Sequence, residues 1–321
     1  MAYTFLCRAV VARADQRERL EMYLRGLLDG AEPKNSEAIA ARWAGDGEAS
    51  GVAQALQHFL GTSPWDFEQF LSCYRDGLPL LQREQPRLWV VQDVVFLKKG
   101  RQSVGTQRQF ARPLGRKVNC QVAVAVSELS PDGFYPLAIR LYLPGYWLRE
   151  NRDLVERLVP AEHRNHLPRS EVAIQLIDQL RVEGRSADVL IADSGFLSSL
   201  DFIEGVEARK LRLLRPGDAW TWPAEETSLG DSFSARLEAW RVSAAGDKEG
   251  VSLAEFGLAE TSRGFDWMRQ NLGLDQFEGR SWLGWHHHAS LVMAAYGFLA
   301  SESLHTAHLP PVLPKVKPNT T

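Results

Sequence analysis

Residues 88–97, LWVVQDVVFL, constrain the fold more than any other stretch of the chain. The run is apolar, β-branched and aromatic, and only Gln92 and Asp93 interrupt it. Such a run predicts a strand buried in the middle of a sheet. A carboxylate in a buried strand costs free energy unless it is paired with a charge or binds a cation. Asp93 is therefore interpreted in two ways, as a metal ligand or as a structural carboxylate bonded to a neighbouring loop.

The segments that follow alternate between strands and helices. Residues 118–127 and 136–143 predict two more strands, which form an antiparallel meander with the first. Residues 170–184 predict an amphipathic helix that Ser170 caps at its start. Residues 235–242 predict one further strand. This order of strand, strand, strand, helix and strand predicts an α/β fold.

A short apolar strand at 188–193 ends in Asp193. This position places the carboxylate at the carboxyl edge of the sheet, where ligands bind in open α/β folds. A functional role is the favoured interpretation of Asp193, and the capping of a following helix is the alternative.

Helices are predicted on both sides of this region. Residues 13–86 show only helical periodicity, and two later helices are expected at 251–271 and 286–300. The N-terminal helices have two open interpretations, recognition of DNA ends or a helical cap without a DNA role. The predicted organisation is a helical subdomain at 1–86, a main domain at 87–304 and a flexible Pro-rich tail at 305–321.

Composition excludes several classes of protein. The three cysteines are widely spaced, which argues against a disulfide framework and against a CxxC metal site. No run reaches the ~18 apolar residues of a membrane span. A cytoplasmic protein without a membrane partner is therefore expected. The net charge of −3 gives no global signal for nucleic acid.

One segment is nevertheless strongly basic. Residues 98–117 contain no acidic residue. Binding of a polyanion such as DNA is one interpretation, because clustered positive charge neutralises phosphates. A solvated surface without a ligand is the other. The candidate DNA-binding residues are Lys98, Lys99, Arg101, Arg108, Arg112, Arg116 and Lys117.

Near the C-terminus, residues 271–288 read NLGLDQFEGRSWLGWHHH. Three consecutive histidines on a helix point in different directions, so His286, His287 and His288 do not have metal-ligand spacing. Capping, packing or a phosphate contact is expected of them instead. The other residues of this segment are too specific in type for generic packing.

Four blocks of the chain, taken in order, resemble the DDE insertion-sequence transposases. They are VVQDVVFLKKGRQSVGTQRQF with VNCQVAV close behind, the strands ending in LYLPGYW, then VLIADSGF, and finally GLDQFEGRSWLGWHHH. The resemblance implies a ribonuclease-H-like mixed sheet flanked by helices. It also implies a site in which two aspartates and a glutamate hold two Mg²⁺ ions for DNA cleavage and strand transfer. A homodimer on paired DNA ends is a further implication.

The position-by-position match is poor at this implied metal site. The first catalytic aspartate falls on Gln92, with Asp93 as its acidic follower, and the second falls on Asp193. The glutamate position, counted back from the C-terminal signature, falls on Ser262. Asp93 cannot replace Gln92 without a bulge, because neighbouring residues of a strand face opposite ways.

Two nearby glutamates are the candidates for the missing ligand. Glu260 lies about 200° around the helix from Ser262, and Glu255 lies about two turns, or 10.5 Å, away. Either one reaches the same metal only if the register is shifted.

Three functions remain open at this point. The first is a DNA-binding pseudoenzyme of transposase descent, with no cofactor and little or no catalysis. The second is an active Mg²⁺-dependent transposase that uses Asp93 and Asp193 as metal ligands, with Glu260 or Glu255. The third is a fold repurposed for a non-DNA ligand or partner. Convergence of these carboxylates within about 4–5 Å of one point distinguishes the second from the others.

Overall fold

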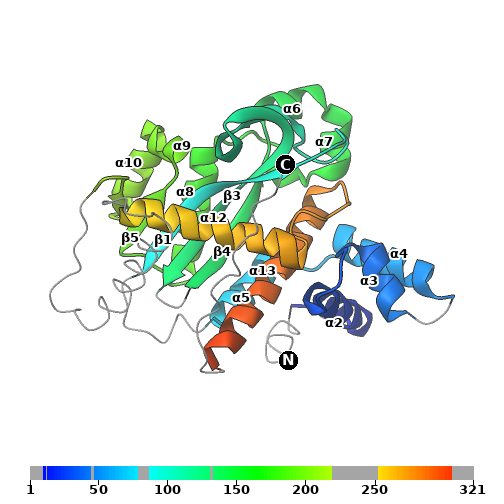
Figure 1. Ribbon diagram of the computed structural model, residues 1–321. Helices are drawn as coiled ribbons and strands as arrows, with labels where there is room; N and C mark the ends of the chain where they lie inside the picture. The colour runs from blue at the N-terminus through cyan, green and yellow to red at the C-terminus, as the bar shows by residue number, and fades with distance from the viewer. Residues whose placement is uncertain are drawn as a thin grey trace, which may run out of the picture.

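A six-stranded mixed sheet forms the centre of the molecule (Figure 1). The computed structural model describes residues 10–305 except 12, 45–46, 79–86, 131–132 and 219–251. The strand order is β2-β3-β1-β5-β6, and β4 also pairs with β3. The strands are β1 (Leu88–Leu97), β2 (Gln107–Ala111), β3 (Arg116–Ser130), β4 (Gly133–Tyr142), β5 (Val189–Ala192) and β6 (Arg212–Leu214). The predicted mixed sheet is confirmed.

Strand β1 occupies the middle of the sheet, as its apolar run predicts. It pairs antiparallel with β3 along one edge and parallel with β5 along the other. Strands β1, β3 and β4 form the expected antiparallel meander. Strand β2 was not predicted, and it pairs with the first five residues of the long strand β3.

Helices cover both faces of the sheet. Helix α12 (Leu253–Leu272) crosses one face, where an added Cβ on Gly257 would lie 2.8 Å from Cδ1 of Ile191 in β5. Helix α8 (Arg169–Val182) packs against β3 and β4, with α10 (Leu200–Ala208) beside it. Because side chains of neighbouring β1 residues reach α12 and α8 respectively, the two helices lie on opposite faces.

Three of the four N-terminal helices, α2, α4 and α5, pack on the C-terminal helix α13 (Trp282–His305), and α3 packs on α4 and α2. The N-terminal helices are α2 (Ala14–Leu28), α3 (Ser36–Trp43), α4 (Ala49–Gly61) and α5 (Phe67–Asp76). Their apolar side chains belong to the same buried cluster as the sheet and α13. Figure 1 shows α13 passing between the sheet and helices α2 to α4.

The three histidines of α13 are packing residues. All three are buried, at 1% exposure or less. They bond to elements far apart in the chain: His286 to the N–H of Leu141, His287 to the carbonyl of Leu60 and His288 to the hydroxyl of Tyr23. Burial lowers the pKa of His288 to about 4. Of capping, packing and a phosphate contact, packing is the interpretation that agrees with their burial and their bonds.

Some expectations differ from the structure or lie outside it. The predicted cap Ser170 is instead the second residue of α8, whose N-cap is Pro168. The short helices α6 (Gly145–Glu150), α7 (Arg152–Leu158) and α9 (Ser194–Leu197) were not predicted. The expected strand at 235–242 and residues 306–321 of the expected tail lie outside the described residues. No helix in the described part of the chain has the length and apolar character needed to cross a membrane.

Candidate functional site

Asp193 lies at the carboxyl end of β5, beside the polar pair of β1. The parallel register of β1 and β5 ends at Val91 and Ala192, so Asp193 follows directly. Its Oδ1 accepts a hydrogen bond from the N–H of Gly195 at 2.7 Å and caps helix α9. Its Oδ2 accepts from the N–H of Asp93 at 3.0 Å. Asp193 therefore lies at the expected edge of the sheet, and it also makes the helix cap that was the alternative to a functional role.

Gln92 and Asp93 point to opposite faces of the sheet. The β1–β3 register is regular here, with Gln92 opposite Ala125 and Asp93 opposite Val124. The strand thus has no bulge that could bring the Asp93 side chain to the face of Gln92. Asp93 reaches α8, where its Oδ2 accepts a hydrogen bond from Nη1 of Arg169 at 2.5 Å.

Gln92 faces helix α12 and meets Ser262 there. Its Oε1 accepts a hydrogen bond from Oγ1 of Thr261 at 2.9 Å and lies 3.5 Å from Oγ of Ser262. A cavity of about 540 Å³ lies beside this pair. The two positions at which the resemblance expects an aspartate and a glutamate are thus adjacent in space, and they carry an amide and a hydroxyl.

The two candidate glutamates have other partners. The Glu260 carboxylate pairs with Arg263, one turn further along α12. Glu255 belongs to the capping box of α12, where its Oε2 accepts from the N–H of Ser252 at 2.9 Å. Within the described residues, no three His, Cys, Asp or Glu side chains are grouped so that they could hold a metal ion.

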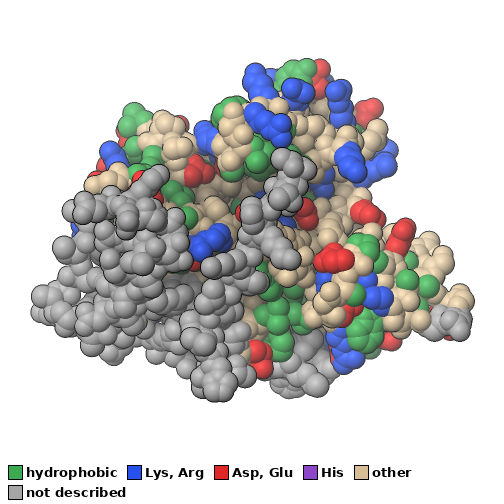
Figure 2. All heavy atoms as spheres, in the orientation of Figure 1, with side chains coloured by type: hydrophobic (Ala, Val, Ile, Leu, Met, Phe, Trp, Pro, Cys, Tyr) green, Lys and Arg blue, Asp and Glu red, His purple; other side chains and the backbone are tan. Residues whose placement is uncertain are grey.

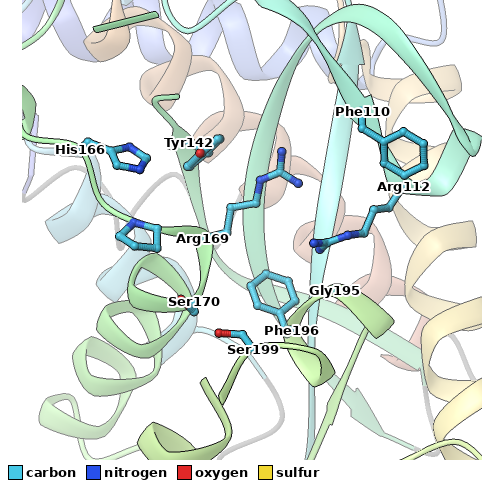
Figure 3. A pocket seen from close by; sticks show the side chains of 10 residues that line it. Phe110, Arg112, Tyr142, His166, Arg169, Ser170, Gly195, Phe196 and Ser199 are labelled. Atoms are coloured by element: carbon cyan, nitrogen blue, oxygen red, sulfur yellow. The ribbon is translucent and has the colours of Figure 1, made fainter. Parts of the chain in front are cut away.

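Two arginines surround the aspartates instead. Arg169 binds Asp93, donates from Nη2 to Oε1 of Gln109 at 3.1 Å, and lies over the ring of Tyr142. Nη1 of Arg112, in the turn after β2, lies 3.7 Å from Oδ2 of Asp93 and 3.8 Å from Oδ1 of Asp193. Figure 3 shows both arginine side chains reaching into one pocket from different elements.

This pocket has a volume of about 400 Å³. Polar and aromatic side chains share its walls. The lining residues other than the two arginines are Phe110, Tyr142, His166, Pro168, Ser170, Gly195, Phe196 and Ser199.

The charges of this group do not suit the Mg²⁺ ions that the resemblance implies. Burial raises the pKa of Asp93 to about 6, and the charge of Arg169 opposes that rise. The two carboxylates already face two guanidinium groups, so no net negative charge is left for a cation. A cation bound about 4 Å from either guanidinium group would be repelled by about 4 kcal/mol per unit charge at an effective dielectric constant of about 20. As arranged here, these residues do not fit a two-metal site.

Two members of the basic segment contact other parts of the protein, and the other five extend into solvent. Lys98 is half-buried, burial lowers the pKa of its amine, and its Nζ donates to the carbonyl of Phe277 at 3.4 Å. Arg112 is turned toward the aspartates. The remaining members are exposed to solvent: Lys99, Arg101, Arg108, Arg116 and Lys117.

Sequence reasoning did not single out Arg169 or Thr261. A buried aspartate demands a partner, but nothing in the sequence indicates which of many arginines provides it across 76 residues. Thr261 precedes Ser262 on the same helix, and a threonine on a helix does not by itself indicate a functional contact.

Comparison with known proteins agrees with this architecture. Residues 8–226 match the family model described as DDE superfamily endonuclease. That match includes β1, the basic segment and Asp193, and it ends before α12. The chain is also 29% identical over 155 residues to a probable transposase for insertion sequence element IS701 from Microchaete diplosiphon. This second match covers 46% of the chain and 38% of the length of that relative. The chain therefore belongs to the DDE superfamily of endonucleases.

Proposed function

We propose that this chain is a DNA-binding member of the transposase family with little or no strand-cleaving activity. One observation carries the proposal: Arg169 already holds the carboxylate of Asp93, while an amide and a hydroxyl occupy the two positions at which the resemblance expects an aspartate and a glutamate. Two vicinal Mg²⁺ ions need several negatively charged oxygen ligands, and the two carboxylates at the sheet edge already face the guanidinium groups of Arg169 and Arg112. We therefore expect this region to contribute to DNA binding and not to hold catalytic metal ions.

Family membership and the exposed basic residues support DNA as the ligand. Lys99, Arg101 and Arg108 extend into solvent from the segment that follows β1. Figure 2 shows many Lys and Arg side chains on the end of the molecule that carries α6 and α7. Exposed lysines and arginines bind phosphates by releasing counterions from DNA. Action in the cytoplasm as a homodimer on paired DNA ends belongs to the same proposal.

The test measures binding and cleavage of duplex DNA that carries the ends of the chain's own element. Fluorescence anisotropy across a salt series should give binding that weakens steeply with salt. A nicking assay with Mg²⁺ or Mn²⁺ should give no product. Metal-dependent nicking would contradict the loss of catalysis, and failure to bind DNA at low salt would exclude DNA as the ligand.

A pair of matched variants tests which basic residues bind. Lys99→Ala combined with Arg101→Ala should lower the slope of log K against log salt by about one for each lost phosphate contact. The control, Arg181→Ala with Arg215→Ala, removes the same charge from exposed positions on α8 and just after β6. Equal effects of the two double variants would show that total charge, and not this segment, governs binding.

A further inference from the structure

Residues 276–281 of the C-terminal signature contact parts of the chain that are distant in sequence, and we call them the signature loop. Oε1 of Gln276 accepts a hydrogen bond from the N–H of Lys34 at 2.6 Å. Oε1 of Glu278 accepts another from Nδ2 of Asn35 at 2.9 Å. The signature loop is thus bonded to the turn between helices α2 and α3 of the N-terminal part.

The signature loop also holds the exposed start of the basic segment from both sides. The carbonyl of Phe277 accepts a hydrogen bond from Nζ of Lys98 at 3.4 Å. The carbonyl of Arg280 accepts one from the N–H of Val104 at 3.0 Å. Residues 99–102, which lie between these two contacts, are exposed to solvent. An exposed basic loop is therefore attached at both ends to one short segment.

The ring of Phe277 anchors the signature loop on helix α13. It stacks on the ring of His288, with centroids 5.6 Å apart and planes inclined by 20°. A Cβ added to Gly284 would lie 2.8 Å from Cζ of Phe277, and a Cβ added to Gly279 would clash with the same atom. The two glycines thus leave the space that the ring occupies. His288 is buried and bonded to Tyr23, so the ring packs against a side chain that is itself held in place.

From these contacts we propose that Phe277 is a positioning residue for DNA binding, which fixes Lys99 and Arg101 relative to the N-terminal helices. The inference rests on the proposed function, in which these two basic residues contact phosphates. A loop that is free in solution must be ordered when it binds, and the lost conformational entropy opposes binding. A loop that is held at both ends has lost much of this freedom before DNA arrives, so its contacts contribute more to affinity.

Positioning and phosphate contact have different effects on binding. Lys99 and Arg101 set the number of phosphates that are neutralised, and hence the slope of log K against log salt. Phe277 carries no charge and acts only through the order of the loop. Its loss should therefore lower the affinity and leave the salt slope unchanged.

The test measures anisotropy of the full chain with DNA that carries the element ends, across a salt series. The temperature is one at which circular dichroism shows every variant folded. Phe277→Ala should bind about 3–10-fold more weakly than the wild type, with the same slope. Phe277→Met keeps a flexible apolar side chain and should recover most of the affinity. Gly279→Ala displaces the ring without removing it and should resemble Phe277→Ala.

Trp267→Ala is the matched control. The Trp267 side chain, like that of Phe277, is partly buried against the main core, and it packs on Tyr296 of α13. Its loss should lower Tm and leave the DNA affinity of the folded protein unchanged. An equal loss of affinity in Trp267→Ala and Phe277→Ala would show a general effect of weakened packing and would overturn the inference.

A double-mutant cycle distinguishes positioning from an unrelated effect on binding. In the background of Lys99→Ala with Arg101→Ala, the change Phe277→Ala should cost little further affinity, because the contacts that the ring positions are already absent. A loss that adds in full would overturn the inference, and so would wild-type affinity in Phe277→Ala alone.

Hydrogen exchange without DNA separates failure of this inference from failure of the proposed function. Phe277→Ala should speed exchange of the amides of residues 99–104, whereas Trp267→Ala should not. Unchanged exchange in Phe277→Ala, with normal DNA binding by the wild type, would defeat the inference and leave the proposed function standing. A wild-type protein that binds no DNA at low salt would instead defeat the proposed function, and with it the role of Phe277 in DNA binding.

Discussion

Nη1 of Arg169 donates a hydrogen bond of 2.5 Å to Oδ2 of Asp93, and this pair joins the central strand β1 to the start of helix α8. The Asp93 side chain is 1% exposed and that of Arg169 is 18% exposed. A buried ion pair of this kind is costly to break from one side, since the remaining charge stays buried.

We therefore expect Arg169→Met to lower the free energy of unfolding by about 3–5 kcal/mol. Urea denaturation followed by circular dichroism measures the loss. Combining it with Asp93→Asn should restore a large part, because the stranded charge is removed. Arg13→Met, which breaks an exposed pair with Asp15, is the control and should leave the stability nearly unchanged. A similar small loss in both single variants would contradict the structural role of Arg169.

Because Gln92 and Ser262 are adjacent, the carboxylates that the resemblance expects at these two positions can be restored together by mutation. Gln92→Asp with Ser262→Glu places two new carboxylates at the contact between β1 and α12. In EDTA we expect a loss of about 3 kcal/mol or more, because the charge introduced at position 92 is buried, where the native Gln92 is 5% exposed. Mn²⁺ should recover part of this loss, which thermal unfolding would measure. Gln92→Asn with Ser262→Ala adds no charge and should not respond to Mn²⁺. If the charged variant ignores Mn²⁺ as well, the two positions are not placed to bind a cation together.

The buried carboxyl of Glu128 predicts a loss of stability as pH rises from 4.5 to about 7. Its carboxyl is 7% exposed and accepts a hydrogen bond from Nε1 of Trp89 at 3.3 Å. Burial raises its pKa from 4.5 to about 7. Between these values the folded chain keeps a proton that the unfolded chain releases, so stability falls as pH rises. The difference corresponds to about 3 kcal/mol.

Glu128→Gln should remove this dependence and be more stable than the wild type above pH 7. Urea denaturation between pH 4.5 and 8 measures it. The exposed Glu37→Gln is the control and should follow the wild-type profile. Parallel pH profiles for Glu128→Gln and the wild type would show that Glu128 has the same pKa in the folded and the unfolded chain.

His288 predicts the opposite trend in acid. Burial lowers its pKa from 6.5 to about 4, while Nε2 lies 3.0 Å from the carbonyl of Gly273. Below pH 6.5 the unfolded chain takes up a proton that the folded chain refuses, so stability falls as pH falls toward 4. His288→Gln keeps one donor and one acceptor and should flatten the profile by about 3 kcal/mol across this window. The control is His58→Gln, at an exposed residue of α4, which should keep the wild-type profile. An acid profile of His288→Gln equal to that of the wild type would exclude His288 as a source of acid sensitivity.

Sequence alone predicted those elements whose chemistry is locally unambiguous. The apolar run at 88–97 coincides with β1, and the run ending in Asp193 coincides with β5 to within one residue at each end. Counting back from Gly273 located Ser262, because the register of a continuous helix is preserved between the two. These predictions depend on patterns of about ten to twenty neighbouring residues.

The remaining features depend on distant contacts. Strand β2 alternates exposed and buried residues inside a segment dominated by charge, so its pairing with β3 had no clear local signal. The partner of Asp93 could not be identified because Arg169 arrives from a different layer of the fold. The position of Arg112 follows from the turn after β2 and from the missing side chain of Gly195, neither of which periodicity describes.

The contacts of α13 have a consequence for how the chain acquires its structure during synthesis. His288 bonds to Tyr23 across 265 residues, and His287 bonds to Leu60 across 227 residues. A ribosome makes the N-terminal helices first, yet their apolar faces lack this partner until the last helix has emerged. We infer that helices α2 to α4 complete their packing only late in translation, since long-range contacts form after the chain between them is available.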